Sequence, residues 1–197
     1  ATWEYVSYLE EQGDCETAIP LAESFFAYIE LNGDQQIQIN FDALEQGGVR
    51  YSYSIIHCDA NWQRSILSPI QYMSGFQGLT IDDFANSINT TTQYTNYNLL
   101  LPNEDIQFKV SGNYAVQIYN EDIPDQIVLT ACFSVVEPMV GISASVSGNT
   151  DIDTNQTHQQ VSFTVNNKNF PIPYPQTDLK IYVYQDNRRD NAVSGLQ

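Results

Sequence analysis

Residues 50–78, RYSYSIIHCDANWQRSILSPIQYMSGFQG, carry the strongest structural signal in the chain. In the segment 51–57, residues that favour β-strands nearly alternate with small polar residues, and this period of two predicts a strand. After this segment the aromatic residues continue, but the alternation is lost and Pro69, Gly75 and Gly78 interrupt the pattern. We therefore predict a central strand followed by a long, structured loop. Loops of this kind on a rigid sheet commonly carry function.

Similar strand patterns, separated by turn signals, recur on both sides of this stretch. Residues 35–41 alternate through Ile37, Ile39 and Phe41, and Gly47-Gly48 follow as a turn signal. We expect this segment to form a hairpin with the 51–57 strand. Further strands are predicted at residues 93–101, 106–110, 111–119, 127–136, 140–146, 159–165 and 178–184.

The segment Gly112-x-Tyr114-x-Val116 refines this prediction. Immunoglobulin-type sandwiches often place a tyrosine near the start of the penultimate strand, where its hydroxyl bonds to the backbone a few residues upstream. An ordinary strand tyrosine is the alternative interpretation. Short strands separated by turns predict an all-β protein in either case. We expect an immunoglobulin-like or fibronectin type III-like β-sandwich, followed by a second, incomplete β-sandwich domain.

A domain boundary is predicted near residue 137. Residues 1–137 hold 19 acidic and three basic residues, whereas residues 138–197 hold five and four, and Glu137-Pro138 ends a strand because proline cannot donate to a ladder. We expect an N-terminal β-sandwich domain at 1–137, with 1–20 as a poorly defined lead-in. The 60 residues that follow are too few for a complete sandwich, so we expect 138–197 to be the start of a truncated second β domain.

The net charge of −17 excludes several classes of partner. Nucleic-acid-binding proteins present basic surfaces to phosphate, and anionic membrane surfaces also attract basic proteins. Two explanations of the acidity stay open: a basic partner, or the solubility of a β protein rich in aromatic residues. No segment approaches the ~20 apolar residues of a membrane span. No signal-peptide pattern is present, as expected of a mature or trimmed secreted chain.

The three cysteines, Cys15, Cys58 and Cys132, allow at most one internal disulfide. Their spacing matches no zinc-binding pattern. The predicted strands place Cys58 and Cys132 on or beside neighbouring strands, where they could form a disulfide. A buried reduced thiol is at least as good an interpretation. The sequence leaves the disulfide state of all three cysteines open.

No catalytic site or cofactor is predicted. His57 and Cys58 are adjacent, and neighbouring residues of a strand point to opposite faces, so the two do not suit nucleophilic catalysis. A hydrogen-bonded residue at a strand end is the better interpretation of His57. Asp151 and Asp153 alternate as in calcium loops, but the glycine and distal glutamate of an EF-hand are missing. We expect a polar turn there and no metal site.

Aromatic residues around the long loop are the candidate contact residues. Trp62, Tyr72 and Phe76 suit a protein contact or a sugar platform, and the alternative is a small core beneath the loop. An exposed aromatic line in a shallow groove favours sugar binding, whereas a broad patch with an aromatic centre and a polar rim favours a protein partner.

Several ordered blocks, spread over residues 20–195, carry a resemblance to a known family. The blocks are Tyr51-x-Tyr53-x-x-Ile56-His57-Cys58-Asp59-Ala60-x-Trp62, Leu67-Ser68-Pro69-x-x-Tyr72, Gly75-Phe76, Tyr94-Thr95-x-Tyr97, Leu101-Pro102-Asn103-Glu104-Asp105, Ser111-Gly112-Asn113-Tyr114, Thr150-Asp151-x-Asp153, Thr157-His158-Gln159, Phe170-Pro171-Ile172 and Asp190-Asn191-Ala192. With these blocks in register, the chain resembles the N-terminal portion of the plug proteins of the type IX secretion system.

The resemblance implies a non-enzymatic protein of the periplasm, associated with the outer membrane. Such proteins bind the periplasmic end of the outer-membrane translocon barrel and occlude it through protein–protein contacts. No catalytic residues, metal or cofactor come with the family. The alternative function is a carbohydrate-binding or adhesive β-sandwich module of a secreted cell-surface protein.

Overall fold

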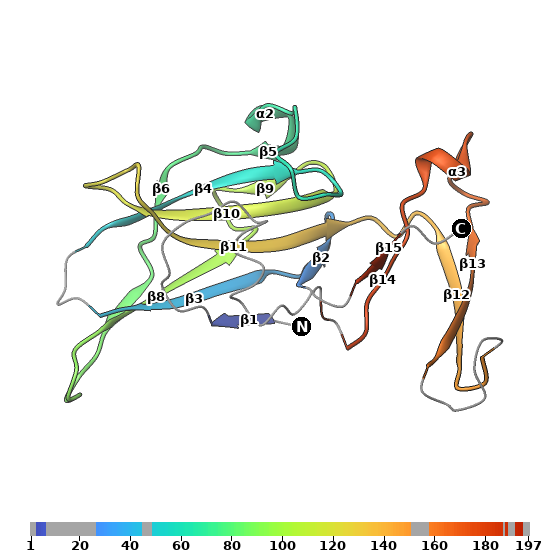
Figure 1. Ribbon diagram of the computed structural model, residues 1–197. Coiled ribbons are helices and arrows are strands. Elements are labelled where there is room, and N and C mark those ends of the chain that lie inside the picture. Colours follow the sequence, from blue (N-terminus) through green and yellow to red (C-terminus); the bar gives the residue numbers. More distant parts are fainter. Residues whose placement is uncertain are drawn as a thin grey trace. The chain divides into compact units, whose positions relative to one another are not determined.

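The computed structural model describes residues 27–44, 49–150, 158–186, 188 and 192–194, together with the backbone of residues 3–6. The fold is mostly β, as the sequence predicts, and it also contains a few short helices that the all-β prediction did not include (Figure 1). The contacts divide it into two compact units. The first consists of Ala1–Glu137 with Tyr182–Leu196, and the second consists of Pro138–Ile181 with Gln197. A truncated second sandwich domain stays a prediction.

The first unit contains a four-stranded sheet in the order β1-β3-β8-β7. β1 runs parallel to β3, and the other neighbours are antiparallel. The alternating residues of β3, Ile37, Ile39 and Phe41, are all buried, as their spacing predicts. The strands of this sheet are β1 (Trp3–Val6), β3 (Ile37–Ala43), β8 (Thr95–Leu101) and β7 (Phe84–Asn86).

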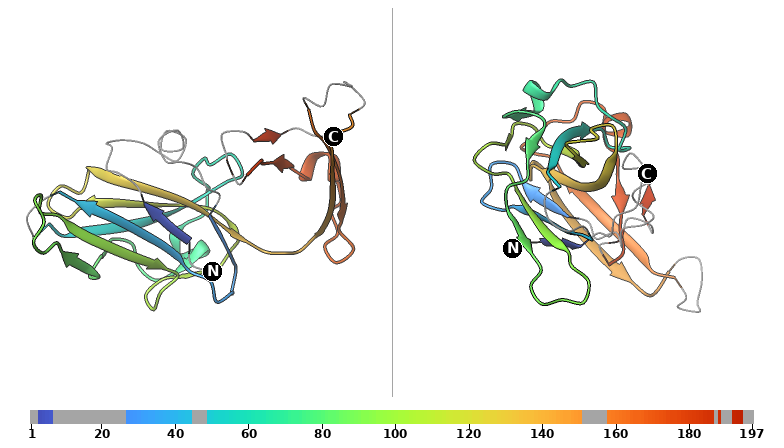
Figure 2. Two further views of the ribbon diagram at one scale, coloured as in Figure 1. Left: turned by 90° about the horizontal axis from the view of Figure 1, so that it is seen from below. Right: turned by 90° about the vertical axis from the view of Figure 1, so that its left-hand side faces the viewer.

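A five-stranded sheet in the order β2-β11-β10-β4-β6 forms the other layer of the first unit (Figures 1 and 2). β4 is the predicted central strand, and it pairs with β10 on one side and with β6 on the other. β2 is parallel to β11. The strands are β2 (Tyr28–Glu30), β11 (Ile127–Val136), β10 (Gly112–Asn120), β4 (Tyr51–Cys58) and β6 (Leu79–Thr80).

The predicted hairpin between residues 35–41 and 51–57 is wrong. β3 and β4 lie in different sheets, and each pairs with strands that are distant in sequence. The reason is that both strands have an apolar face to bury, and the two faces meet across the core. The rings of Phe41 and Tyr51 pack edge to face with centroids 5.5 Å apart. A connection between layers therefore replaces the hairpin.

One apolar core fills the space between the two sheets. Tyr114 of β10 is fully buried at its centre, and its hydroxyl donates to the backbone carbonyl of Val110 at 2.7 Å. This is the upstream backbone bond predicted for Tyr114. Burial raises the pKa of the Tyr114 hydroxyl strongly, and the neighbouring Tyr72 adds to the effect. The hydroxyl therefore stays a donor at neutral pH.

The second unit is built on β12 (Gly141–Ser147) and β13 (Gln160–Asn166), which form an antiparallel pair. The strand predicted at 178–184 is largely wrong. Pro175 is the first residue of a helical turn, α3 (Pro175–Asp178), and proline suits that position. Only β14 (Tyr182–Val183) of that segment is a strand; it belongs to the first unit, where it pairs with β15 (Val193–Ser194).

The remaining elements also belong to the first unit. They are α2 (Pro69–Tyr72), β5 (Met73–Ser74) and β9 (Gln107–Phe108).

Candidate functional site

Residues 59–78, the β4–β6 loop, leave β4 through a tight turn. A carboxylate oxygen of Asp59 accepts hydrogen bonds from the backbone N–H of Asn61 at 2.8 Å and of Gln63 at 3.0 Å. Trp62 lies between them with φ of 64°, which is uncommon for a bulky residue. The Asp59 side chain, an Asx-type cap, is the local cause of the turn.

The loop then returns along the open edge of β4. The backbone N–H of Ser65 donates to the His57 carbonyl, and that of Gly78 donates to the Tyr53 carbonyl. Between them the Gln77 side chain takes the place of a strand residue. Its oxygen accepts from the Ile55 N–H and its nitrogen donates to the Ile55 carbonyl, both at 2.7 Å. An open strand edge invites pairing with other chains, and the loop closes this one.

α2 holds the outer part of the loop (Figure 1). The backbone N–H and hydroxyl of Ser68 both donate to the side-chain oxygen of Gln71, at 2.8 and 2.9 Å. Pro69 follows at the first helical position, where its missing N–H costs nothing. The ammonium group of Lys109 donates to the carbonyl of Ile70 at 2.9 Å. The loop is therefore anchored at both ends and in the middle.

The three candidate contact residues differ in environment. Tyr72 is only 4% exposed, and its hydroxyl donates to the Ile55 carbonyl at 2.7 Å. Trp62 is half-buried and packs against Cys58 and Ala115. Phe76 is 79% exposed. The three rings therefore do not form the open aromatic line that favours sugar binding, and Phe76 alone is broadly available to a partner.

His57 and Cys58, at the end of β4, lie in different surroundings. The His57 ring contacts Tyr72 and Tyr114, and its nitrogens hydrogen-bond the Ser65 hydroxyl at 2.8 Å and the Ser111 carbonyl at 3.3 Å. Cys58 packs in a separate small cluster. This arrangement confirms His57 as a hydrogen-bonded residue at a strand end. The two side chains point to opposite faces, as expected of neighbours on a strand.

The two cysteines that the structure describes, Cys58 and Cys132, are in different states. Cys58 is a buried, reduced thiol, which decides between the two interpretations of this residue. Cys132 is disulfide-bonded. Cys15 lies outside the described residues, as do Asp151 and Asp153, so the calcium-loop alternative is not tested. Within the described part of the chain, no group of three or more His, Cys, Asp and Glu side chains is arranged to hold a metal ion.

A shallow groove of about 470 Å³ lies near the end of β8 in the first unit. Asp34 and Glu104 contribute carboxylates, and the other polar side chains are carboxamides. Some of these amides are engaged within the protein: Gln36 donates to the Pro102 carbonyl and Gln107 to the Asn103 carbonyl, both at 2.7 Å. The groove is thus a polar, acidic surface feature.

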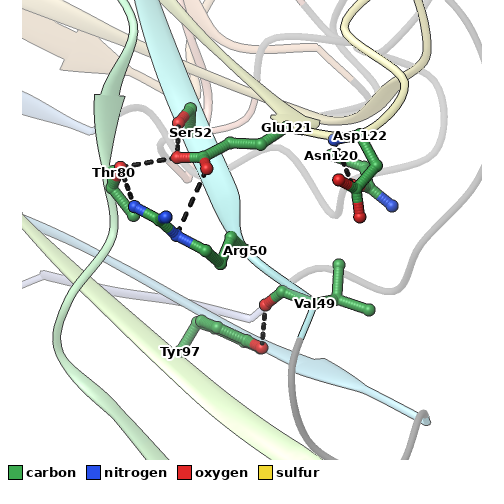
Figure 3. Close-up of polar contacts among 8 residues, drawn as sticks. All are labelled: Val49, Arg50, Ser52, Thr80, Tyr97, Asn120, Glu121 and Asp122. Carbon is green, nitrogen blue, oxygen red and sulfur yellow. Dashed lines mark hydrogen bonds and ion pairs between the residues drawn. The ribbon is translucent and has the colours of Figure 1, made fainter.

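A polar cluster lies at the other end of β4 (Figure 3). One carboxylate oxygen of Glu121 accepts from the hydroxyls of Thr80 at 2.6 Å and Ser52 at 2.7 Å, and the other lies 3.2 Å from the Arg50 guanidinium. The two hydroxyl bonds, followed by the Arg50 charge, lower the pKa of Glu121. The cluster ties β6 and the turn after β10 to β4. Its carboxylate is occupied by protein donors, so we assign it a structural role.

We predict that Glu121→Gln lowers stability at pH 7. Since the pKa of Glu121 is lowered in the folded state, its stabilisation is fully present above the ordinary glutamate value of 4.5 and is lost as the pH falls through the lowered value. The urea midpoints of wild type and variant should therefore converge on acidification. Asp125→Asn, in the same turn, is the control and should show no such convergence. Equal midpoints at pH 7 would contradict the assignment.

Comparison with known proteins identifies the family of this chain. Residues 15–137 match the family model of the type 9 secretion system plug protein first domain. The chain belongs to the type 9 secretion system plug protein family. This confirms the resemblance carried by the sequence blocks. No curated protein shows significant sequence similarity to the chain.

A solved structure is similar to this plug-family chain along nearly its whole length. It is the crystal structure of a hypothetical protein from Parabacteroides merdae ATCC 43184, with 68% sequence identity and a TM-score of 0.84. The match covers 97% of the chain and 47% of that protein. The chain thus spans about half the length of this relative. Among the residues that the structure describes, no helix has the length and apolar character needed to cross a membrane.

Two exposed residues of the plug-family chain were not singled out from the sequence. Ile66 is fully exposed, and Ile70 on α2 is 76% exposed. Together with Phe76 they form a set that we call the exposed loop residues. The sequence signal for them is weak, because Ile66 is followed by Leu67 and nothing in the pattern separates exposed from buried apolar residues once the strand alternation has ended. A contiguous patch of such residues is typical of a protein-binding surface, whereas single exposed apolar residues are common on any protein.

Proposed function

We propose that this plug-family protein works without catalysis in the periplasm, where it binds the periplasmic end of the outer-membrane type IX translocon and occludes it. The family match over residues 15–137 carries this proposal. A protein that blocks a pore acts through its shape and its contacts, so it needs a rigid body and a binding surface rather than an active site. The continuous core of the first unit is consistent with such a body.

We further propose that the β4–β6 loop contributes to the contact with the translocon. The exposed loop residues supply apolar contact area. Trp62, in the same loop, adds an aromatic ring that is partly exposed to solvent. Tyr72 supports the loop from beneath through its bond to Ile55 and does not itself reach the surface. The anchored backbone limits the conformational entropy that the loop loses on binding, which favours affinity.

The test is co-purification of the full-length protein with the translocon from detergent-solubilised outer membranes, scored by mass spectrometry. Wild type should recover the translocon barrel. The double substitution Ile70→Asp with Phe76→Asp should reduce recovery at least about tenfold, because it replaces two exposed apolar contacts by carboxylates. Both positions face solvent, so folding should be preserved, and circular dichroism checks this.

Ile88→Asp is the matched control. Ile88 is 82% exposed and lies between β7 and β8, outside the β4–β6 loop. This variant should recover the barrel like wild type. If the Ile70→Asp, Phe76→Asp variant recovers as much translocon barrel as wild type, the β4–β6 loop is not a contact with the translocon. The proposed function would not be affected by that result. Failure of wild type to recover the barrel, with retention on polysaccharide resin, would overturn the proposed function in favour of carbohydrate binding.

We also infer that the first unit is an immunoglobulin-type sandwich. Three neighbours of one sheet, β11-β10-β4, correspond to strands G, F and C, and β3-β8-β7 of the other correspond to B, E and D. The bond from the Tyr114 hydroxyl to the backbone four residues upstream matches the tyrosine corner of these domains. The strand order and this bond are the support for the assignment.

A further inference from the structure

The β12–β13 pair of the second unit has two chemically different faces. Residues directly opposite each other on antiparallel strands share a face, and the side alternates along each strand. Ile142 pairs with Val165, Ala144 with Phe163, and Val146 with Val161. The opposite face carries the pairs Ser143–Thr164 and Ser145–Ser162. One face of the hairpin is therefore entirely apolar, and the other carries hydroxyl groups.

The apolar face is largely open to solvent in the described part of the second unit. Ile142 is 67% exposed, Val146 is 62% exposed and Val161 is 39% exposed, whereas Phe163 and Val165 are half-buried. An isolated two-stranded hairpin is at best marginally stable in water. Antiparallel sheets that are apolar on one face and polar on the other normally pack the apolar face on a core. The pattern thus predicts a covering layer.

The length of the relative indicates where this layer comes from. The structural match, at 68% sequence identity, covers 97% of this chain but only 47% of the Parabacteroides merdae protein. The family model that matches residues 15–137 describes a first domain. We propose that β-strands from the half of the full-length protein outside this match cover the face formed by Ile142, Ala144, Val146, Val161, Phe163 and Val165. The hydroxyl face then stays toward water.

Covalent linkage favours this occupant over a second copy of the protein. A strand layer of the same polypeptide is present at a high effective concentration, whereas a second copy must associate from solution. The face is also continuous and uncharged, which suits a permanent apolar core better than a reversible interface with a polar rim. The hairpin is accordingly one layer of a larger β domain.

The test measures side-chain protection in the full-length protein. Ala144→Cys on the apolar face and Ser145→Cys on the hydroxyl face are compared by their rates of reaction with a fluorescent maleimide, with wild type as the background. Cys at 144 should react at least about tenfold more slowly than Cys at 145, since reaction then requires local opening. Val146→Cys is a second probe of the apolar face and should behave like Ala144→Cys.

The outcomes distinguish the possible occupants. Slow labelling at 144 and 146 that is independent of protein concentration supports the proposal. Protection that disappears on dilution would assign the face to a second copy and overturn it. Equal, fast labelling at 144 and 145 would leave the face uncovered, and equal, slow labelling would mean that both faces are buried. Either of these results would also overturn the proposal.

Discussion

Gly75→Ala should destabilise the first unit by about 2–5 kcal/mol. Gly75 has φ of +114°, a conformation that costs a residue with a Cβ about 1–2 kcal/mol. An added Cβ would lie 2.1 Å from the Asp105 carbonyl oxygen and 2.8 Å from the Cδ1 of Ile106. The first neighbour is backbone, held next to the β5–β9 pair, so it cannot move aside without breaking that pairing. Overpacking of this kind adds about 1–3 kcal/mol.

Urea denaturation followed by circular dichroism measures this effect. Gly148→Ala is the control, because nothing lies within 4 Å of an added Cβ at that position. It should change the free energy of unfolding by less than about 0.5 kcal/mol. A loss of under 1 kcal/mol for Gly75→Ala would show that the β4–β6 loop yields to the new methyl group and is not anchored as described.

Local alternation predicted most strands of the first unit but not their partners. β3, β4, β10 and β11 all bury the alternating side chains that their sequences indicate. Strand pairing depends on which apolar faces meet across the core, and this is a property of distant segments. The expected hairpin between β3 and β4 failed for that reason. No turn signal distinguishes a connection within a sheet from one between layers.

The candidate site shows the same limit at the level of single residues. Tyr72 and Phe76 lie four residues apart in a segment without alternation, yet one is 4% exposed and the other 79%. The difference arises from α2, which ends at Tyr72 and places this side chain against the backbone of β4. Composition identified the loop as aromatic and structured. Only the packing of the loop on β4 separates the supporting ring from the exposed one.

Tyr114→Ala should cost about 4–6 kcal/mol of unfolding free energy. The Tyr114 side chain is fully buried, and its ring contacts those of Phe108, His57 and Phe133 with centroids 4.7, 5.0 and 5.8 Å away. Truncation of a buried aromatic residue to alanine typically costs about 3–5 kcal/mol, because apolar contacts are lost and a cavity forms. The Val110 carbonyl also loses its hydroxyl donor, which adds about 1 kcal/mol.

Tyr114→Phe separates the ring from the hydroxyl. It keeps the ring contacts and removes the bond to Val110, so it should cost about 1–2 kcal/mol. The hydroxyl also lies 3.3 Å from the Tyr72 carbonyl, but that carbonyl keeps the backbone N–H of Lys109 as a donor, so little is added. Tyr174→Phe, at a position 72% exposed, is the control and should be neutral within about 0.5 kcal/mol. If phenylalanine at position 114 cost as much as alanine, the hydroxyl bond rather than the ring would hold β10 to the segment before it. The tyrosine corner would then be the main stabilising contact at this point of the fold.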